Sequence, residues 1–262
     1  MSNWKMKLQS RSTWAWPYAL FMLCLVVLPL LLIGVYAFTN PEGKFTLHNF
    51  VSFFTNSLYI NSFIYSIGIA LITTIICLVL GYPAAYIMAM ASFKTPQVIA
   101  MLFILPMWIN FLLRTIATVE LFHMFGLPLG EGALIFGMVY DFLPFMIYPI
   151  YNTLQKMDMS LIEAAHDLGA NRRQVFTKVT LPLSMPGIYS GIVMVFMPTV
   201  STFAISELLT HNKITLFGSL IQRSFGEGGK AMWNYGAALS LIMLIIIALT
   251  SFFGGDKEDI NR

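Results

Sequence analysis

A few ionisable side chains lie where the surrounding sequence is strongly apolar. Asp141 and Arg114 each fall within a long hydrophobic run, and Glu207 follows the end of another. A charge at the centre of a membrane helix costs about 2.5–3.5 kcal/mol on insertion scales, so such a residue faces a cavity or an opposite charge. Asp141 and Glu207 are therefore candidates to bind a cation. The structural alternatives are an Asp141–Arg114 ion pair and a solvated Glu207.

Aromatic side chains at similar heights would suit a cation, because the face of an aromatic ring attracts positive charge. The candidates are Trp108, Tyr140 and Phe203. Aromatic residues make up 15% of the chain, so most of them pack inside the protein or anchor it at the membrane surface. Arg114 would repel a cation unless a carboxylate pairs with it. Near the end of a membrane helix it can instead extend toward the lipid headgroups.

The sequence contains no pattern typical of catalysis or metal binding. Residues 226–230 end like a phosphate-binding loop, but Ser224 occupies the position of that loop's first glycine. The four histidines are scattered, and none has metal-ligand spacing with another His or Cys. We therefore expect that this chain is not an enzyme and that it binds neither a metal nor a cofactor.

The composition is typical of a membrane protein. Of the 262 residues, 58% are hydrophobic and 10% are charged, whereas soluble domains carry about a quarter charged residues. The small net charge of +3 and the scattered basic residues argue against nucleic-acid binding, so membrane lipid is the expected surrounding. A membrane helix needs about 20 apolar residues. The sequence predicts one all-α transmembrane domain over residues 1–262, with spans at 16–38, 62–91, 97–119, 132–154, 183–205 and 232–254.

Lysine and arginine predict the orientation of these spans, because they are enriched in cytoplasmic segments. With a cytoplasmic N-terminus, ten of them fall inside and four outside. The first apolar run resembles a signal peptide, but it is long and no small-residue cleavage site follows it. We therefore interpret it as a retained membrane helix, and we expect both termini to be cytoplasmic.

A polar block at residues 158–182 lies between the fourth and fifth spans, on the predicted cytoplasmic side. Ser160 and Glu163 have the spacing of a capping box, which predicts a helix that begins near Leu161. Gly169 is suited to the left-handed conformation at the C-terminal end of that helix.

The second part of the block predicts another short helix. Asn171 can cap its start, with Gln174 three residues later, and Pro182 is expected to end the block before the fifth span. An ordinary solvated loop is the simpler interpretation, but such a loop could be far shorter. Two capped helices favour a docking element for a soluble partner.

The spacing of the block resembles the EAA loop of ABC-importer permeases. The matching residues are Glu163-Ala164-Ala165, Gly169 after three residues, Val179 after nine more, and Leu181-Pro182 after one more. Val179 is the one departure, because the family pattern usually has isoleucine there. The resemblance implies that this block is a coupling helix that fits a cleft in a cytoplasmic ATPase. It implies coupling roles for Glu163, Ala164, Ala165, Asp167, Gly169, Ala170, Leu181 and Pro182.

Other motifs look like the spermidine/putrescine permeases of the same class, over about residues 60–225. They are Gly81-Tyr82-Pro83-Ala84, residues 105–110 with Arg114, and residues 143–151. This resemblance implies a type I ABC-importer permease in the cell membrane of a prokaryote, moving polyamines by alternating access. The implied partners are a cytoplasmic ATPase dimer that holds ATP and Mg, a second and non-identical permease, and an extracellular or periplasmic substrate-binding protein.

Two alternatives stay open at this point. Related permeases for ferric ion, thiamine or sulfate share the fold, so the cargo could be another solute. A secondary transporter or a channel would not need a loop that docks an ATPase.

Overall fold

The computed structural model describes residues 11–90, 96–226 and 230–255. These residues are almost entirely helical, and their one extended pairing is an isolated bridge between Thr39 and Phe45. The chain divides into two compact units, and helix α14 (Lys230–Gly255) runs through both of them. Unit 1 comprises Met1–Asn56 and Ile221–Leu244, and unit 2 comprises Ser57–Leu220 and Ile245–Arg262.

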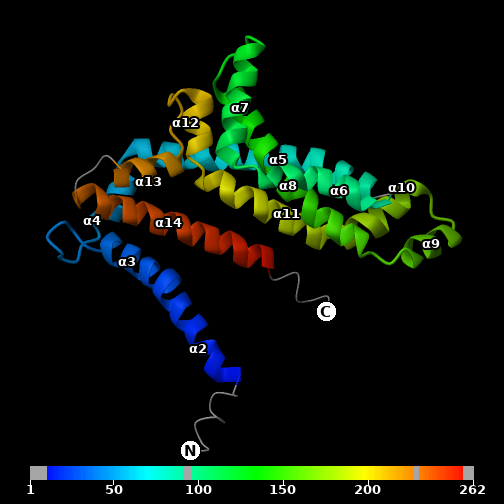
Figure 1. Cartoon of the computed structure of the whole chain (residues 1–262), viewed down its shortest axis with the longest axis horizontal. Helices are drawn as coiled ribbons and strands as arrows, with labels where there is room; N and C mark the ends of the chain where they lie inside the picture. Colours follow the sequence, from blue (N-terminus) through cyan, green and yellow to red (C-terminus); the bar gives the residue numbers. More distant parts are fainter. Residues whose placement is uncertain (1–10, 91–95, 227–229, 256–262) are drawn as a thin grey trace, which may run out of the picture. The chain divides into compact units, whose positions relative to one another are not determined.

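Five helices of the described residues are long and apolar enough to cross a membrane (Figure 1). They match five of the six predicted spans, and the prediction of an all-α membrane protein is confirmed. The largest shift is in the fifth span, whose helix begins at Arg172 and not at residue 183. Three of the five are single helices or part of one: α5 (Ser57–Met90), α8 (Glu131–Gln155) and Met232–Thr250 within α14. The first span, Trp16–Ala37, lies within α2 (Arg11–Met22), η1 (Leu23–Val27) and α3 (Leu28–Ala37). The span Arg172–Ser201 is made of α10 (Arg172–Val175), η3 (Phe176–Thr180) and α11 (Leu181–Ser201).

The third predicted span, 97–119, is not one continuous helix. The chain forms α6 (Pro96–Ile104) and a 3-10 turn, η2 (Leu105–Trp108), and then bends by 97° into α7 (Phe111–Met124). Pro106 lacks a backbone donor, which favours a helix break. The Asn110 side chain then accepts a hydrogen bond from Leu112 N at 2.9 Å and starts the new helix.

The fifth predicted span, 183–205, also ends early. Helix α11 stops at Ser201, and a separate short helix, α12 (Ala204–Thr210), begins after Thr202 and Phe203. A Cβ atom on Gly218, in the following helix α13 (Phe217–Gly226), would lie 2.4 Å from the Ser201 carbonyl oxygen. Only glycine therefore allows α13 to pack against the end of α11.

Two membrane helices contain a π turn shortly before a proline. The turn η1 precedes Pro29, and the turn η3 precedes Pro182 at the same spacing. A proline ring clashes with the carbonyl group four residues earlier. The wider π turn falls at that carbonyl, and the helix continues through each proline.

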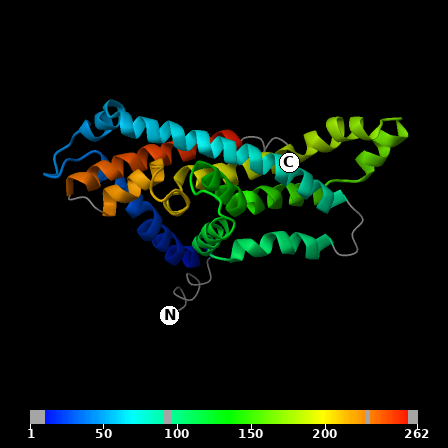
Figure 2. The same ribbon diagram turned by 90° about the horizontal axis from the view of Figure 1, so that it is seen from above.

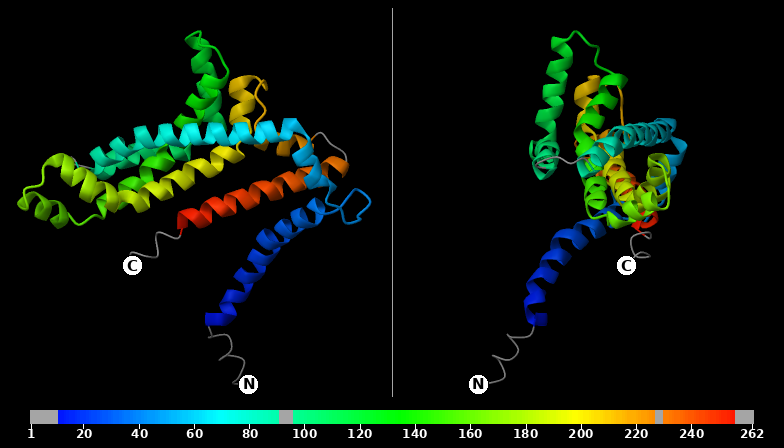
Figure 3. Two further views of the ribbon diagram at one scale, coloured as in Figure 1. Left: turned by 180° about the vertical axis from the view of Figure 1, so that it is seen from behind. Right: turned by 90° about the vertical axis from the view of Figure 1, so that its right-hand side faces the viewer.

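The core of unit 2 is formed by α5, α8 and α11, which run side by side (Figures 1 and 2). Met146, Ile150 and Val195 are among its fully buried side chains. Helix α9 (Ser160–Asp167) lies beyond one end of this layer, whereas α7 and α12 project from its side (Figure 3). Unit 2 therefore separates a polar end from a region where two helices break.

Two glycines let α11 approach α8 closely. A Cβ atom on Gly187 would lie 2.8 Å from the Pro149 carbonyl oxygen, and one on Gly191 would lie 2.7 Å from the Met146 sulfur. These glycines are four residues apart on one face of the helix, which is the spacing of small residues at membrane helix interfaces.

Unit 1 joins α3 to α4 (His48–Thr55) and to the first part of α14. The side chains of Ala37, Ala237 and Ala238 are buried together. The Asn234 amide donates to the Tyr36 carbonyl at 3.0 Å, and the Asn49 amide donates to the Ala37 carbonyl at 2.9 Å. Polar side chains thus take up the backbone groups that α3 leaves unpaired at its C-terminal end.

We expect Gly187→Ala to destabilise the protein by roughly 1–3 kcal/mol, because the added methyl group meets a backbone oxygen that cannot move away. Gly68→Ala is the matched control, since a Cβ atom there has no neighbour within 4 Å. The melting temperature of the purified protein measures the effect. Equal melting temperatures for the two variants would contradict this packing.

Candidate functional site

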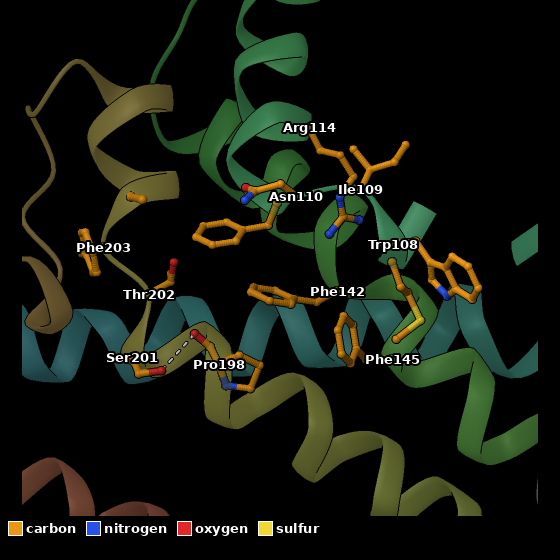
Figure 4. A pocket seen from close by; sticks show the side chains of 13 residues that line it. Trp108, Ile109, Asn110, Arg114, Phe142, Phe145, Pro198, Ser201, Thr202 and Phe203 are labelled. Atoms are coloured by element: carbon orange, nitrogen blue, oxygen red, sulfur yellow. Dashed lines mark hydrogen bonds between the residues drawn. The ribbon is translucent and has the colours of Figure 1, made fainter. Parts of the chain in front are cut away.

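A cavity of about 590 Å³ lies in unit 2 where the two helix breaks come together (Figure 4). Its wall includes the break after η2 and the break after α11. Residues from α8 complete it. The lining residues are Met107, Trp108, Ile109, Asn110, Phe111, Arg114, Phe142, Phe145, Pro198, Ser201, Thr202, Phe203 and Ala204.

Five of the thirteen residues that line the cavity are aromatic, and its polar groups are the charged Arg114 and three uncharged side chains, Asn110, Ser201 and Thr202. Figure 4 shows Arg114, Phe142 and Phe145 on one side, and Thr202 and Phe203 on the other. Aromatic faces with a small number of oriented polar groups are typical of a binding site for a small organic cation.

Arg114 forms an ion pair with Asp141 behind this wall. Its Nε atom lies 3.3 Å from Asp141 Oδ1, and both side chains are buried. The Thr115 hydroxyl donates to Asp141 Oδ2 at 3.1 Å, and Arg114 Nη1 donates to the Asp141 backbone carbonyl at 3.4 Å. The Arg114 guanidinium also lies 5.9 Å from the centre of the Tyr140 ring. Of the alternatives that the sequence left open for Arg114, the structure therefore has the ion pair with Asp141 and not a side chain extended toward the lipid headgroups.

The structure brings together only some of the residues predicted to contact a cation. Trp108 and Phe203 line the cavity, and they are 84% and 38% exposed. Asp141 is fully buried and does not line it, and Tyr140 stacks on Arg114. Glu207 lies in the first turn of α12, also outside the lining.

Sequence reasoning missed Phe142, Ser201 and Thr202, which line the cavity. Phe142 directly follows Asp141 in the sequence, but Phe142 lines the cavity and Asp141 does not. Pro198 was a usable signal for the other two, because a proline near the end of an apolar run often accompanies a helix break.

The polar block forms the predicted first helix, α9, at the end of unit 2. Gly169 has a φ angle of +82°, the left-handed conformation expected of it. Gly169 N donates to the His166 carbonyl at 2.9 Å, and Ala170 N donates to the Ala165 carbonyl at 3.0 Å. This pattern is a Schellman motif, and the predicted helix stop is confirmed.

The predicted capping box of Ser160 and Glu163 at the start of α9 is wrong. Ser160 makes no capping bond to the backbone of the next turn. Instead, Asp158 Oδ1 accepts a hydrogen bond from Ser160 N at 3.0 Å, and the same bond lowers the pKa of the Asp158 carboxyl. A carboxylate at this end of a helix is favoured by the helix dipole.

The second predicted helix exists but is not separate. The capping box of Asn171 and Gln174 is formed as predicted, with both hydrogen bonds at 2.9 Å. The helix that it starts continues through η3 into α11, so Pro182 does not end the block. Phe176 packs edge-on against Tyr82 and Tyr86 of α5, which fixes the block to the core.

Helix α9 presents an unusual face to its surroundings, because none of its residues is buried. Leu168, directly after it, is 89% exposed, and Met159 and Leu161 are about half exposed. Glu163 and Ala164 lie between them and are exposed as well. Met159, Leu161 and Leu168 thus leave apolar side chains exposed on and directly beside one short polar helix.

Comparison with known proteins places the chain among transport proteins. The model of the family described as "Binding-protein-dependent transport system inner membrane component" matches residues 78–255. The chain is 34% identical over 252 residues to the spermidine/putrescine transport system permease protein PotB of Escherichia coli (strain K12), with 87% of this chain and 90% of that protein covered. PotB of Haemophilus influenzae is also 34% identical, over 255 residues, with 88% of each chain covered.

Two solved structures share the fold. A bacterial ABC transporter involved in the import of the acidic polysaccharide alginate has a TM-score of 0.75 at 16% identity and covers 100% of both chains. The MetNI methionine ABC transporter, in inward-facing conformations, has a TM-score of 0.62 at 18% identity and covers 78% of this chain and 96% of that chain. At these identities the likeness concerns the fold alone.

We expect Asp158→Ala to loosen the start of α9, because Ser160 N loses its acceptor. Ser160→Ala, which keeps that backbone bond, should have a smaller effect. Hydrogen exchange of the amides in the first turn of α9 measures both. Since the pKa of Asp158 is lowered, its contribution is present at neutral pH and is lost only as the pH falls through that lowered pKa. Equal exchange in both variants would contradict the assignment.

Proposed function

The chain belongs to the family of binding-protein-dependent transport system inner membrane components, and from this membership we propose that it carries polyamines, spermidine or putrescine, through the membrane. It is a multi-pass permease subunit of an ABC importer, works with a substrate-binding protein and an ATPase, and is not itself an enzyme. The resemblance found in its sequence motifs is thereby confirmed.

The observation that carries the polyamine proposal is the identity to PotB proteins along almost the whole chain. The cavity supports it. Polyamines are flexible chains of methylene groups and ammonium groups, and the cavity offers aromatic faces and uncharged polar groups. The fixed charge of Arg114 is already paired, so it leaves no free cation in the wall.

We propose that α9 is the helix that docks the ATPase. The exposed residues Glu163, Ala164, Asp167 and Gly169 would form the contact together with Ala165 and Ala170, which are only partly buried. Leu181 packs against the core of unit 2 and Pro182 follows η3, so these two would position the block rather than touch the partner. ATP and Mg would be held by the ATPase and not by this chain.

The remaining features of the importer are proposals of the same kind. The distribution of lysine and arginine supports a cytoplasmic location for the polar block and both termini. A second, non-identical permease would complete the path, as the resemblance to the spermidine/putrescine permeases implies. The two permeases would then expose the cavity alternately to either side of the membrane as ATP binds and is hydrolysed.

The test of the proposed cargo is ATP-dependent uptake by the assembled complex in proteoliposomes. We expect uptake of labelled spermidine or putrescine that requires the binding protein. Unlabelled polyamine should compete with it, whereas thiamine, ferric ion and sulfate should not. Uptake that follows one of these other solutes, with no polyamine uptake, would overturn the cargo assignment and leave the family intact.

We expect Leu168→Arg to abolish co-purification of the ATPase without unfolding the chain, because the side chain is 89% exposed and buries nothing within the chain. Leu127→Arg is the matched control, since Leu127 is also an exposed leucine after a helix, beyond α7. The ratio of ATPase to permease after affinity purification measures the effect. A normal ratio for Leu168→Arg would count against docking at α9.

We expect Phe203→Ala to weaken transport of spermidine. Loss of one aromatic face costs about 0.5–2 kcal/mol of cation binding, which is roughly a 2- to 30-fold rise in KM. Phe125→Ala is the control, because Phe125 is an exposed phenylalanine outside the cavity. If both variants transport like the unchanged protein, the cavity is not on the path.

A further inference from the structure

Arg114 occupies a difficult position for a transporter of cations. Among the described residues that line the cavity, its side chain is the only one that carries a charge. Most of the wall around it is apolar, and charges interact strongly where water is scarce. An uncompensated guanidinium at this place would repel a polyamine from the cavity.

Asp141 compensates that charge from behind the wall. Its carboxylate lies 3.3 Å from Arg114 Nε and is fully buried, and it does not line the cavity. The Thr115 hydroxyl holds its second oxygen at 3.1 Å. A molecule in the cavity therefore meets Arg114 but has no direct route to Asp141.

We propose that Asp141 determines the charge selectivity of the cavity by neutralising Arg114, without touching the cargo. Asp141 is in this sense a positioning residue, and the ion pair makes the wall electrically neutral toward a polycation. The inference rests on the proposed function, because it requires a cationic cargo that passes through this cavity.

Arg114 has a structural reason to be present despite its charge. Its Nη1 atom donates to the backbone carbonyl of Asp141, and its guanidinium stacks on Tyr140. It thus ties the first turn of α7 to the middle of α8, directly after the helix break. The carboxylate of Asp141 neutralises the Arg114 charge, so Arg114 can link α7 to α8 without repelling a cation in the cavity.

The test is the Asp141→Asn variant in the complete complex, with spermidine and putrescine measured in parallel at low cargo concentration. This change removes one negative charge and keeps the shape of the side chain. Repulsion by the uncompensated Arg114 charge scales with the charge of the cargo, so we expect KM to rise roughly tenfold for trivalent spermidine and roughly fivefold for divalent putrescine. The spermidine-to-putrescine uptake ratio then falls roughly twofold, and this ratio does not depend on how much complex assembles.

Two further variants separate charge from structure. Thr115→Val removes the hydroxyl that holds Asp141 but changes no charge, so the uptake ratio should stay at that of the unchanged protein. The double variant Arg114→Gln with Asp141→Asn removes both charges, and it should restore the ratio that Asp141→Asn alone lowers. This double variant also tests the proposal if the single one does not assemble.

The outcomes are distinct. An unchanged complex that imports neither polyamine overturns the proposed function. A complex that imports both, but shows the same loss for both cargoes in Asp141→Asn, assigns Asp141 a structural role only. A double variant whose ratio falls below that of the unchanged protein means that Asp141 itself contacts the cargo. Either of the last two results overturns the inference and leaves the proposed function standing.

Discussion

A backbone N–H or C=O group inside a membrane has no water to bond, so each helix break needs partners from the protein itself. The break after η2 is closed by the Asn110 side chain on Leu112 N. At the break after α11, the Phe203 carbonyl accepts from Glu207 N at 3.0 Å in the first turn of α12. Beyond α12, the Ser206 hydroxyl donates to the Ile214 carbonyl, and the Ser66 hydroxyl accepts from Phe217 N at the start of α13. The cavity lies where the two breaks come together.

The same constraint explains the charged pair beside the breaks. A long α7 continuing from α6 would need no tie, but the bent α7 must be held against α8 by something other than its own backbone. Arg114 supplies that link through the Asp141 carbonyl and carboxylate. Removing one partner of a buried pair is costly because the other charge is left without compensation. The architecture of this region therefore depends on both residues, although only one of them reaches the cavity.

The sequence predicted what depends on local pattern and missed what depends on tertiary contacts. Hydrophobic run length located five membrane helices, and glycine and asparagine located the stop at Gly169 and the cap at Asn171. The 97° bend after Trp108 was missed, because proline within an apolar run is compatible with both a continuous and a broken helix. Both Asp158 and Ser160 are residue types that can cap the start of α9, and the path of the backbone decides that Asp158 accepts the hydrogen bond. The burial of Asp141 likewise depends on α7 packing against α8, which no spacing in the sequence encodes.

One continuous helix connects the two functional regions of unit 2. The segment Arg172–Ser201 starts at the capping box beside α9, and its 30 residues extend about 45 Å, at roughly 1.5 Å per residue, to the cavity. Phe176 holds its first turns against α5, and Gly187 and Gly191 hold its middle against α8. A close-packed helix moves as a unit, so a displacement at the proposed docking end also displaces Ser201 and the adjoining Thr202 in the cavity wall. The second predicted helix is therefore part of the same continuous helix as α11, and not a separate helix as predicted. This continuous helix joins the block next to α9, the proposed docking helix, to the cavity wall, with the π turn at η3 and two internal prolines, Pro186 and Pro198, along it.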